Sequence, residues 1–412
     1  MNRTLIWQLA IRYLRGKRSA NAVPVLSRIS MVAIAVGAAA MVIIFSVFNG
    51  LESLVKNTYK AFYPPVRISI ARGKFFDADS AKINAIKRLD VVKCLSMVIE
   101  DNALAMDEND KEQKVITLKG VDKNYFLVND IRTYIVHGED SVSTGHPYTA
   151  IVGGRIVNEL GVDVNYIYSK IKLIYLNPAV TNPEADPTSA IQELAIHPAG
   201  IFKVEDDFDS KYVLAPLPLV QKLFMQEHKY SSIEISAEPE DVPRLKKELQ
   251  AMFGSAYKVE NRYEQNRTMY AVMGSEKWAI RAILLLVLLI ASFNMVGALA
   301  LLVMEKRQDI AILKAMGAEI NTIRSIFLLE GLLWSLTGGI SGMLIGTLIC
   351  VAQQQFGLIP MRGTFLVENF PVEIQVPDLL LVAGIILTVG LLAAWYPAIR
   401  ATKTLDPTLK SA

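Results

Sequence analysis

The chain has 412 residues, 52% of them hydrophobic, and its 43 lysine and arginine residues nearly balance 40 aspartate and glutamate residues. So large an apolar share is unusual for a soluble protein, and the near-neutral charge gives no reason to expect a nucleic-acid partner. Two cysteines, Cys94 and Cys350, argue against a disulfide scaffold.

The first element predicted along the chain is a cytoplasmic amphipathic segment over residues 1–28. Its stretch Thr4–Tyr13 places Leu5 and Leu9 on one side, and basic residues follow from Arg12 onward. A helix lying on the inner membrane surface fits this pattern, and docking against a cytoplasmic partner is the alternative.

Four apolar runs without Asp, Glu, Lys or Arg are each long enough to cross a bilayer as a helix. These runs are Ile29–Phe48, Ala282–Met304, Gly331–Ile359 and Leu379–Ile399. They predict an α-helical membrane protein with four transmembrane helices, at residues 29–50, 278–304, 324–353 and 378–399. The basic region before the first run is too long for a cleaved signal peptide, so we expect this run to remain as an anchor.

Lysine and arginine in the short flanks of the spans predict the orientation of the chain. They gather in residues 1–28, in the loop 305–323 and in the tail 400–412, whereas the loop 354–377 has Arg362 as its one basic residue. Both termini and the loop 305–323 are therefore expected in the cytoplasm. The large segment between the first two spans is expected on the other side of the membrane.

Residues 51–277 alternate strand and helix signals, which predicts a large α+β domain inserted between the first and second spans. Extended segments are expected at Val66–Ala71, Val91–Met106 and Gln113–Val121, and helices at Ser80–Leu89, Arg155–Leu160, Pro216–Gln226 and Pro239–Phe253. Helical stalks over Glu52–Tyr59 and Val259–Lys277 would connect this domain to the spans.

The segment Asn177–Gln192 interrupts this pattern with three prolines, two acids and few large apolar residues. We expect it to be an exposed loop. It is either a flexible insertion or a protruding element that touches a partner or a cargo.

Motifs for several chemistries are missing from the sequence. It has no GxxxxGK[ST] phosphate loop, and its four histidines lack the spacing of metal ligands. Few ionisable residues lie within the spans, which argues against a proton- or ion-coupled transporter. We therefore expect no enzyme activity, cofactor or metal in this chain, so the energy for any work must come from elsewhere.

The third span carries glycines at helical spacing. Gly338, Gly342 and Gly346 recur every four residues, and Gly331 and Gly339 lie on the neighbouring track. Small residues at this spacing let helix backbones approach closely in a membrane. Close packing within the chain or across a dimer is predicted, and the general abundance of glycine in membrane helices is the alternative explanation.

The segment Glu305–Gly317 is a short charged stretch held between the second and third spans. Ile310, Leu313 and Gly317 share one side of its predicted helix, with Lys314 near the C-terminal end, where the helix macrodipole favours a cation. A cytoplasmic helix this apolar must bury itself against lipid or protein. It is therefore either a membrane-surface anchor or a point on which a cytoplasmic protein acts.

Residues 305–318, EKRQDIAILKAMGA, closely resemble the segment after the second span in permeases of the lipoprotein-releasing ABC transporter family. That family belongs to a wider group with the macrolide-exporter and FtsX-type permeases. Further similar stretches are Asn49–Glu52, Ala150–Val162, Phe327–Gly331 and Tyr396–Ala398. The resemblance covers the membrane portion and the layout of the chain, and it is looser over the outer domain.

The resemblance implies a permease subunit of the cell inner membrane that pairs with a second copy or a paralogue and with two separate ATPase subunits. ATP and Mg²⁺ would be bound by the ATPase. The implied ATPase-coupling residues are Glu305, Lys306, Arg307, Asp309, Ile310, Leu313, Met316 and Gly317. Closure of the ATPases would move the spans and, through the stalks, the periplasmic domains, a mechanism called mechanotransmission.

The resemblance also implies a lipoprotein cargo, which is taken from the outer leaflet of the inner membrane and passed to a periplasmic carrier. Candidate contacts to its acyl chains, unless they face lipid, are Ile44, Phe45, Val47 and Phe48. Candidate carrier-loop residues are Asn177, Pro178, Pro183 and Pro187. Two other functions stay open: export of periplasmic small molecules or peptides, as in macrolide-exporter-like permeases, and FtsX-like signalling that controls a cell-wall hydrolase.

Overall fold

A computed structural model describes residues 23–403, apart from 109–110, 146–147, 165, 167–168, 177–190, 362–366 and 368. The chain forms two compact units. The helical unit comprises the residues up to 54, 272–361 and those from 369, and the inserted unit comprises 55–271 with 362–368. The predicted segment Thr4–Tyr13 and the loop residues Asn177, Pro178, Pro183 and Pro187 lie outside the described residues.

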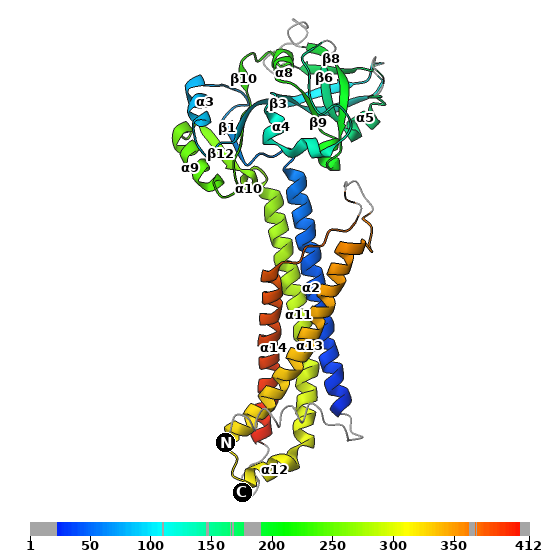
Figure 1. The fold of residues 1–412 in the computed structure, drawn as a ribbon, viewed down its shortest axis with the longest axis vertical. Helices are drawn as coiled ribbons and strands as arrows, with labels where there is room; N and C mark the ends of the chain where they lie inside the picture. The colour runs from blue at the N-terminus through cyan, green and yellow to red at the C-terminus, as the bar shows by residue number, and fades with distance from the viewer. Residues whose placement is uncertain are drawn as a thin grey trace. The chain divides into compact units, whose positions relative to one another are not determined.

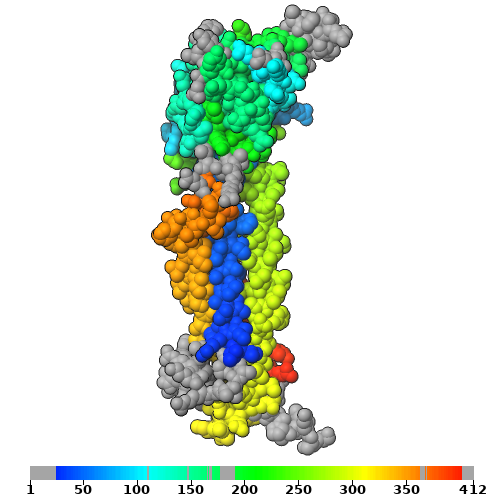
Figure 2. Space-filling view, turned by 90° about the vertical axis from the view of Figure 1, so that its right-hand side faces the viewer, coloured from blue at the N-terminus to red at the C-terminus, as the bar shows by residue number. Residues whose placement is uncertain are grey.

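The helical unit is built on four long helices. They are α2 (Val23–Tyr59), α11 (Arg267–Glu305), α13 (Ile320–Phe356) and α14 (Val376–Lys403). All four are long and apolar enough to cross a membrane, and Figure 1 shows them running side by side. In Figure 2, α2 (blue) lies with α13 (orange) on one side and α11 (yellow-green) on the other. The prediction of four transmembrane helices is confirmed.

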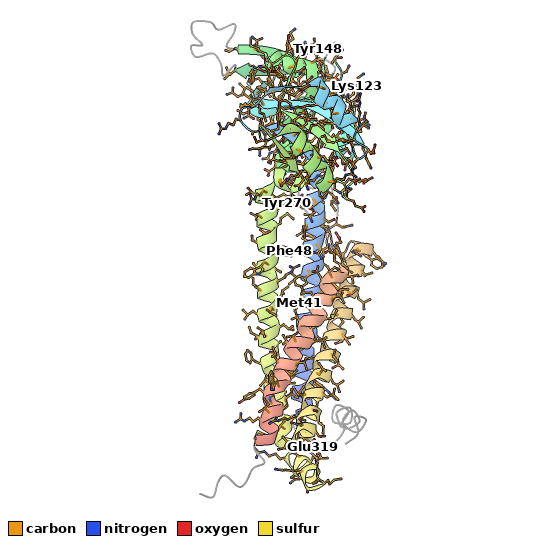
Figure 3. All side chains as sticks on the ribbon, turned by 90° about the vertical axis from the view of Figure 1, so that its left-hand side faces the viewer. Met41, Phe48, Lys123, Tyr148, Tyr270 and Glu319 are labelled. Carbon is orange, nitrogen blue, oxygen red and sulfur yellow. The ribbon has the colours of Figure 1, made fainter. Side chains whose placement is uncertain are left out.

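Apolar side chains from all four helices fill the interior of this unit. One cluster lies at Ile34, Met295, Leu299, Phe327, Trp334 and Ala394, among others. A second cluster includes Met41, Val42, Phe45, Leu284, Leu288, Val382 and Ile386. Met41 and Phe48 mark the course of α2 in Figure 3. Each helix thus buries one side within the chain and leaves the other apolar side exposed, as expected for a helix surrounded by lipid.

The inserted unit contains a ten-stranded sheet among its described residues. In spatial order the strands are β12 (Tyr257–Asn261), β1 (Val66–Ile70), β11 (Ser232–Ser236), β3 (Cys94–Met106), β4 (Gln113–Val121), β9 (Tyr212–Pro216), β6 (Thr149–Gly153), β8 (Ile191–Phe202) and β5 (Ile135–Gly138). Strand β7 (Ile171–Leu176) pairs with both β3 and β8. The pairs β4–β9 and β6–β8 are parallel. Two short strands, β2 (Phe76–Asp77) and β10 (Lys229–Tyr230), pair apart from this sheet.

Short helices cover the sheet, so the predicted α+β domain between the first and second membrane helices is confirmed. They are α3 (Ser80–Lys87), α4 (Tyr125–Val128), α5 (Gly154–Glu159), α7 (Asp206–Asp209), α8 (Leu217–Leu223), α9 (Val242–Phe253), α10 (Arg262–Gln265) and the 3₁₀ helix η1 (Asp130–Tyr134). One face of the sheet carries the main apolar core, to which alternate residues such as Ile68, Ile99, Leu118 and Ile233 contribute. This alternation is the period of two that a strand with one apolar face requires.

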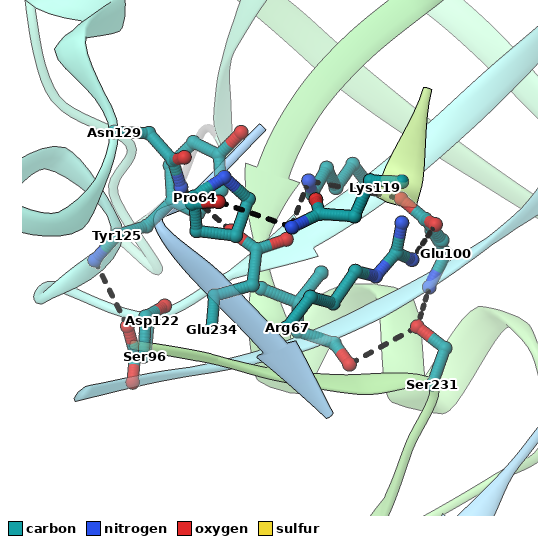
Figure 4. A network of polar contacts seen from close by, with 12 residues as sticks. Pro64, Arg67, Ser96, Glu100, Lys119, Asp122, Tyr125, Asn129, Ser231 and Glu234 are labelled. Atoms are coloured by element: carbon teal, nitrogen blue, oxygen red, sulfur yellow. Dashed lines mark hydrogen bonds and ion pairs between the residues drawn. The ribbon is translucent and has the colours of Figure 1, made fainter. Parts of the chain in front are cut away.

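The opposite face of the sheet carries a buried row of charges (Figure 4). Arg67 of β1 lies opposite Glu234 of β11, and Glu100 of β3 lies opposite Lys119 of β4. The Lys119 Nζ donates to Glu234 Oε1 at 2.8 Å, and the Asn129 Nδ2 donates to Glu234 Oε2 at 2.6 Å. Arg67 pairs with Glu100. The carboxylates of Glu234 and Glu100 lie on the two central strands, between Arg67 on β1 and Lys119 on β4, so the row favours one register of the sheet.

Aromatic residues pack the end of α2 against the face of the sheet that carries the charges. Phe62 stacks on Phe208 with ring centroids 4.8 Å apart and contacts Tyr212 at 4.6 Å, and Tyr59 meets Phe208 edge-on at 5.1 Å. The returning chain is tied here too, because Arg262 Nε donates to the Tyr63 carbonyl at 2.8 Å. Both chain segments that enter and leave the inserted unit are therefore anchored on its core.

A buried carboxyl lies beside this aromatic cluster. Asp209 is 2% exposed, and its Oδ1 accepts a hydrogen bond from the Val204 backbone N–H at 2.7 Å. Burial raises the pKa of Asp209 from 3.8 to about 6, and burial together with nearby acids raises the pKa of Glu205. The folded unit therefore favours the protonated acid at this position.

We expect the titration of Asp209 to make the inserted unit more stable at pH 4 than at pH 7. A carboxyl whose pKa is raised by folding contributes stability below its unfolded pKa, and this contribution is lost as the pH rises through its folded pKa. Asp209→Asn should remove roughly 1–3 kcal/mol of this dependence between about pH 4 and 6. Urea unfolding of the full-length protein at several pH values, followed by near-UV circular dichroism, measures it. An unchanged pH slope in the Asn variant would contradict the assignment.

Candidate coupling site

The short helix α12 (Arg307–Ala315) connects α11 to α13. Lys306 alone separates it from the last residue of α11, so the two helices are joined almost directly. Lys306 Nζ pairs with Asp309 Oδ2 at 3.2 Å in the first turn. An acid in the first turn and Lys314 in the last turn both complement the helix macrodipole.

Gly317 ends α12 in a left-handed turn. Its φ is +85°, its N–H donates to the Lys314 carbonyl at 3.0 Å, and the Ala318 N–H donates to the Leu313 carbonyl at 3.0 Å. These two bonds form a Schellman motif, which satisfies carbonyls that the helix end would otherwise leave unpaired. Nothing lies within 4 Å of the place where a Cβ would be, so the backbone conformation alone favours glycine here.

The two sides of α12 have different surroundings. Ile310 is 2% exposed and packs in the cluster with Leu302 and Phe327, so it seats α12 on the helical unit. Ile312 and Met316 are 58% and 79% exposed. Of the sequence-predicted coupling residues, Met316 is therefore open to a partner and Ile310 is occupied within the chain. Ile312 was not among them, although its position four residues before Met316 places it on the same helix side.

The remaining predicted coupling residues are mostly accessible. Glu305, Arg307 and Gly317 are exposed, whereas Lys306, Asp309 and Leu313 are half-buried. Exposed basic and apolar groups thus lie together on one short helix. Such a helix can enter a groove on another protein, with apolar anchors in the centre and charges at the rim.

The predicted packing glycines of α13 serve two different neighbours. A Cβ on Gly342 would lie 2.1 Å from the Ala35 carbonyl oxygen of α2, and one on Gly338 would lie 2.6 Å from the Met31 carbonyl oxygen. A Cβ on Gly346 would come 2.9 Å from the Ala39 oxygen. These three glycines therefore bring the backbones of α2 and α13 together.

The second glycine track faces α14. A Cβ on Gly331 would lie 2.5 Å from the Ala394 Cβ, and one on Gly339 would lie 2.6 Å from the Ile386 Cγ2. Helices α2, α13 and α14 are thus held together at close range. The sequence left open whether the glycines pack within the chain or across a dimer, and the structure uses them within the chain.

The predicted acyl-chain contacts lie along α2. Phe45 is 2% exposed inside the cluster with Leu288 and Ile386, and Ile44 packs at the edge of that cluster. Val47 and Phe48 are half-buried. Val47 and Phe48 are therefore better placed than Phe45 to meet a molecule outside the bundle. Among the described residues, no three His, Cys, Asp or Glu side chains come together as a metal site.

Comparison with protein families gives two matches that together cover most of the chain. Residues 27–252 match the MacB-like periplasmic core domain, which is more than half of the chain, and residues 281–405 match the FtsX-like permease C-terminal domain.

Individual relatives extend over nearly the whole length. The lipoprotein-releasing system transmembrane protein LolC of Neisseria meningitidis serogroup B is 22% identical and covers 96% of both chains. The corresponding LolE of Haemophilus influenzae is 25% identical and covers 95% of both. The solved periplasmic region of MacB from Actinobacillus actinomycetemcomitans aligns with 53% of this chain and 98% of its own, at 10% identity and a TM-score of 0.36.

The chain has the architecture of the transmembrane permease of an ABC transporter. It combines four membrane helices with an α+β domain inserted after the first and a short exposed helix after the second. The chain belongs to the MacB- and FtsX-like family of these permeases and is similar along its length to LolC and LolE. Permeases of this family are membrane-spanning subunits that work with an ATPase in a separate subunit.

Proposed function

We propose that this chain is the permease subunit that extracts lipoproteins from the outer leaflet of the inner membrane and releases them to a periplasmic carrier. The observation that carries this proposal is its similarity to LolC and LolE over 95–96% of both chains, which extends across the membrane helices and the inserted unit alike. ATP and Mg²⁺ would be bound by the partner ATPase, which supplies the energy.

The proposed mechanism is mechanical. An ATPase docked on α12 would displace this helix when it closes on ATP. Because Lys306 alone joins α12 to α11, a displacement of α12 acts on α11 at once. Helix α11 then continues without a break to Arg267, and α2 to Tyr59, both beyond the apolar runs that cross the membrane. A continuous helix transmits displacement along its axis better than a jointed chain.

The anchoring within the inserted unit supports the same mechanism. The chain is held against the sheet where it enters and leaves the inserted unit. The contacts are the aromatic packing of Tyr59 and Phe62 and the hydrogen bond from Arg262 to the Tyr63 carbonyl. Movement of the helices would therefore move the whole unit rather than a loop. In this proposal both termini and α12 are cytoplasmic and the inserted unit is periplasmic, as the basic flanks predict.

Depletion of the protein in its host cell tests the proposal. Lipoproteins that belong in the outer membrane should accumulate in the inner membrane, which fractionation and immunoblotting measure. Unchanged lipoprotein sorting would sink the proposal. Accumulation of a small molecule or peptide in the periplasm would instead favour a MacB-like exporter, and a cell-division or cell-wall defect with normal sorting would favour FtsX-like control of a hydrolase.

We expect Ile312→Asp to weaken association with the ATPase by about tenfold or more. The side chain is 58% exposed on α12, and burying a new carboxylate in an apolar groove costs at least the ~1.4 kcal/mol that corresponds to this factor. Co-purification of the ATPase with the membrane-extracted permease measures the effect. Ile320→Asp is the matched control, because Ile320 is 49% exposed at the first residue of α13, outside α12. Equal recovery of ATPase with both variants would contradict the docking site.

A further inference from the structure

A group of polar side chains joins three helices of the helical unit at one end. We call Asn49, Glu52, Lys277, Arg281 and Asp378 the Asn49 cluster. The Lys277 Nζ of α11 donates to Asn49 Oδ1 and approaches Glu52 Oε2, each at 2.9 Å. The Asn49 Nδ2 donates to Asp378 Oδ2 at 2.6 Å, and an Arg281 guanidinium nitrogen lies 3.7 Å from Asp378 Oδ1. The cluster thus connects α11 to α2 and to the first turn of α14.

The part of this cluster between α2 and α14 is fixed. Asn49 is 1% exposed and Asp378 is 8% exposed. The backbones also meet, since the Glu373 N–H donates to the Ser46 carbonyl at 2.8 Å, and a Cβ on Gly50 would come 2.4 Å from the Pro371 carbonyl oxygen. Close backbone contact and a buried hydrogen bond leave little freedom between α2 and the segment before α14.

The part that reaches α11 is looser. The side chains of Lys277 and Glu52 are 24% and 28% exposed, and Arg281 is 41% exposed with a long contact to Asp378. Ion pairs that water can reach are weak and form and break readily. The polar contacts of α11 are therefore easier to break than those between α2 and α14.

The apolar packing of α11 is also looser than the packing between α2 and α13. Its buried residues form one stripe of mainly large side chains, namely Leu284, Leu288, Ser292, Met295, Ala298, Leu299, Leu302 and Val303. At Gly297 of this helix, no atom lies within 4 Å of the place that a Cβ would occupy, so no backbone approaches it there. Contacts through long side chains can shift past one another, whereas the backbones of α2 and α13 interlock at Gly338, Gly342 and Gly346.

A cavity gives α11 room at its other end. It has a volume of about 190 Å³ and is lined by Ala300, Val303 and Met304 of α11, Arg307 of α12, and Pro397 and Arg400 of α14. This space lies between α14 and the end of α11 that leads into α12, so a shift of α11 there needs less repacking than in a close-packed interior.

We propose that the Asn49 cluster is a reversible latch that holds α11 in its resting position. Lys277 and Arg281 keep α11 against α2 and α14, and release of these contacts lets α11 shift against the rigid group of α2, α13 and α14 when α12 is displaced. The inference rests on the proposed function only in that an ATPase acts on α12. It does not depend on the cargo being a lipoprotein.

Reversible cross-linking tests the latch. Glu52→Cys and Lys277→Cys are introduced into a chain whose Cys94 and Cys350 are replaced by serine, and a short bis-methanethiosulfonate reagent joins them. The permease is assayed with its ATPase in lipid nanodiscs. The link should lower ATP turnover by about fivefold or more, and dithiothreitol should restore it, because a closed latch cannot release α11.

A matched control link joins Gln354→Cys and Val372→Cys. Gln354 Nε2 of α13 donates to the Val372 carbonyl at 2.7 Å, within the group of elements that the latch hypothesis holds rigid. This link should leave ATP turnover unchanged. If the Glu52–Lys277 link leaves turnover unchanged as well, or if both links lower it equally, α11 does not move against α2 and the latch is refuted.

A second variant removes the latch instead of locking it. Lys277→Met should raise ATP turnover in the absence of cargo by about threefold, since the resting position is no longer favoured, whereas Lys277→Arg should keep the resting rate. A residue with a structural role only would lower turnover together with thermal stability, and that outcome overturns the proposal. ATP turnover without cargo is independent of lipoprotein sorting, so the latch and the proposed function can fail separately.

Discussion

Replacing Gly342 with leucine is expected to prevent correct packing of the helical unit. A Cβ at this position would lie 2.1 Å from the Ala35 carbonyl oxygen and 2.8 Å from the Ala35 Cα, which are backbone atoms that no rotamer change can move. Helices α2 and α13 would have to separate along their length. The expected cost is about 3 kcal/mol or more, at the upper end for inserting groups into a packed interior.

Thermal unfolding of the detergent-purified protein and the yield of the monodisperse species measure this effect. Gly384→Leu is the matched control, because Gly384 is also in a membrane helix and no atom lies within 4 Å of its Cβ position. Gly342→Ala should give a smaller loss of the same sign. A Gly342→Leu protein as stable as the Gly384→Leu protein would contradict the close approach of α2 and α13.

Removing the carboxylate of Glu234 is expected to destabilise the inserted unit by about 3–5 kcal/mol, the range for breaking a buried ion pair from one side. Glu234 is 0% exposed, and Lys119, at 2%, has its Nζ within 2.8 Å of one oxygen. In Glu234→Leu the buried ammonium keeps two weaker contacts, with Glu100 Oε2 at 3.7 Å and with the Tyr125 ring, whose centroid is 4.9 Å away. Burial favours the neutral form of Glu100, but the charges of Arg67 and Lys119 outweigh it and hold the pKa of Glu100 at about 2. Glu100 therefore stays ionised and paired with Arg67.

A double-mutant cycle separates the cost of an orphaned charge from the value of the pair. Lys119→Met with Glu234→Leu removes both charges and leaves the Arg67–Glu100 pair intact, so it should recover much of the lost stability. Glu238→Leu is the surface control, since its side chain is 58% exposed and pairs with exposed Lys93. Urea unfolding of the full-length protein gives the free energies. A double variant no more stable than Glu234→Leu would mean that the network is not a set of separable pairs.

The sequence allowed the membrane part of the fold to be predicted because its signals are local. Each charge-free run is long enough to span the bilayer, and all four became helices. The glycines of α13 indicated close packing by spacing alone, but not which helix would meet which track. Gly342 faces α2 and Gly339 faces α14 because the two tracks point in different directions around α13, which only the assembled bundle fixes.

The sequence predicted that the inserted unit is an α+β domain, but it did not predict which strands pair with one another. Strand β4 was expected at Gln113–Val121 and is found there, and the helix expected at Pro239–Phe253 begins at Val242. The charge row escaped prediction because Arg67, Glu100, Lys119 and Glu234 are far apart in sequence and each looks like an ordinary exposed residue of a strand. The short elements α4, α7 and η1 carry too few residues for a helical period.

The coupling helix shows the same limit. Pattern reasoning placed Ile310 and Leu313 on its apolar side, and it could not tell which apolar residues the chain itself would bury. Ile310 packs against α11 and α13, and Ile312 and Met316 remain exposed. The Asn49 cluster was also out of reach, since Asn49, Lys277 and Asp378 come from three separate helices.

The pairing of the first and last strands of the inserted unit has a consequence for the order in which the protein is made. Strand β1 has β11 and β12 as its neighbours, with Val66 opposite both Ile235 and Asn261. During synthesis β1 therefore waits, unpaired on both sides, until the chain as far as β11 and β12 has crossed the membrane. The unit cannot complete its sheet before the chain reaches α11, so insertion of the second membrane helix and folding of the domain fall at nearly the same moment. In that interval both edges of β1 are open to pairing with other chains.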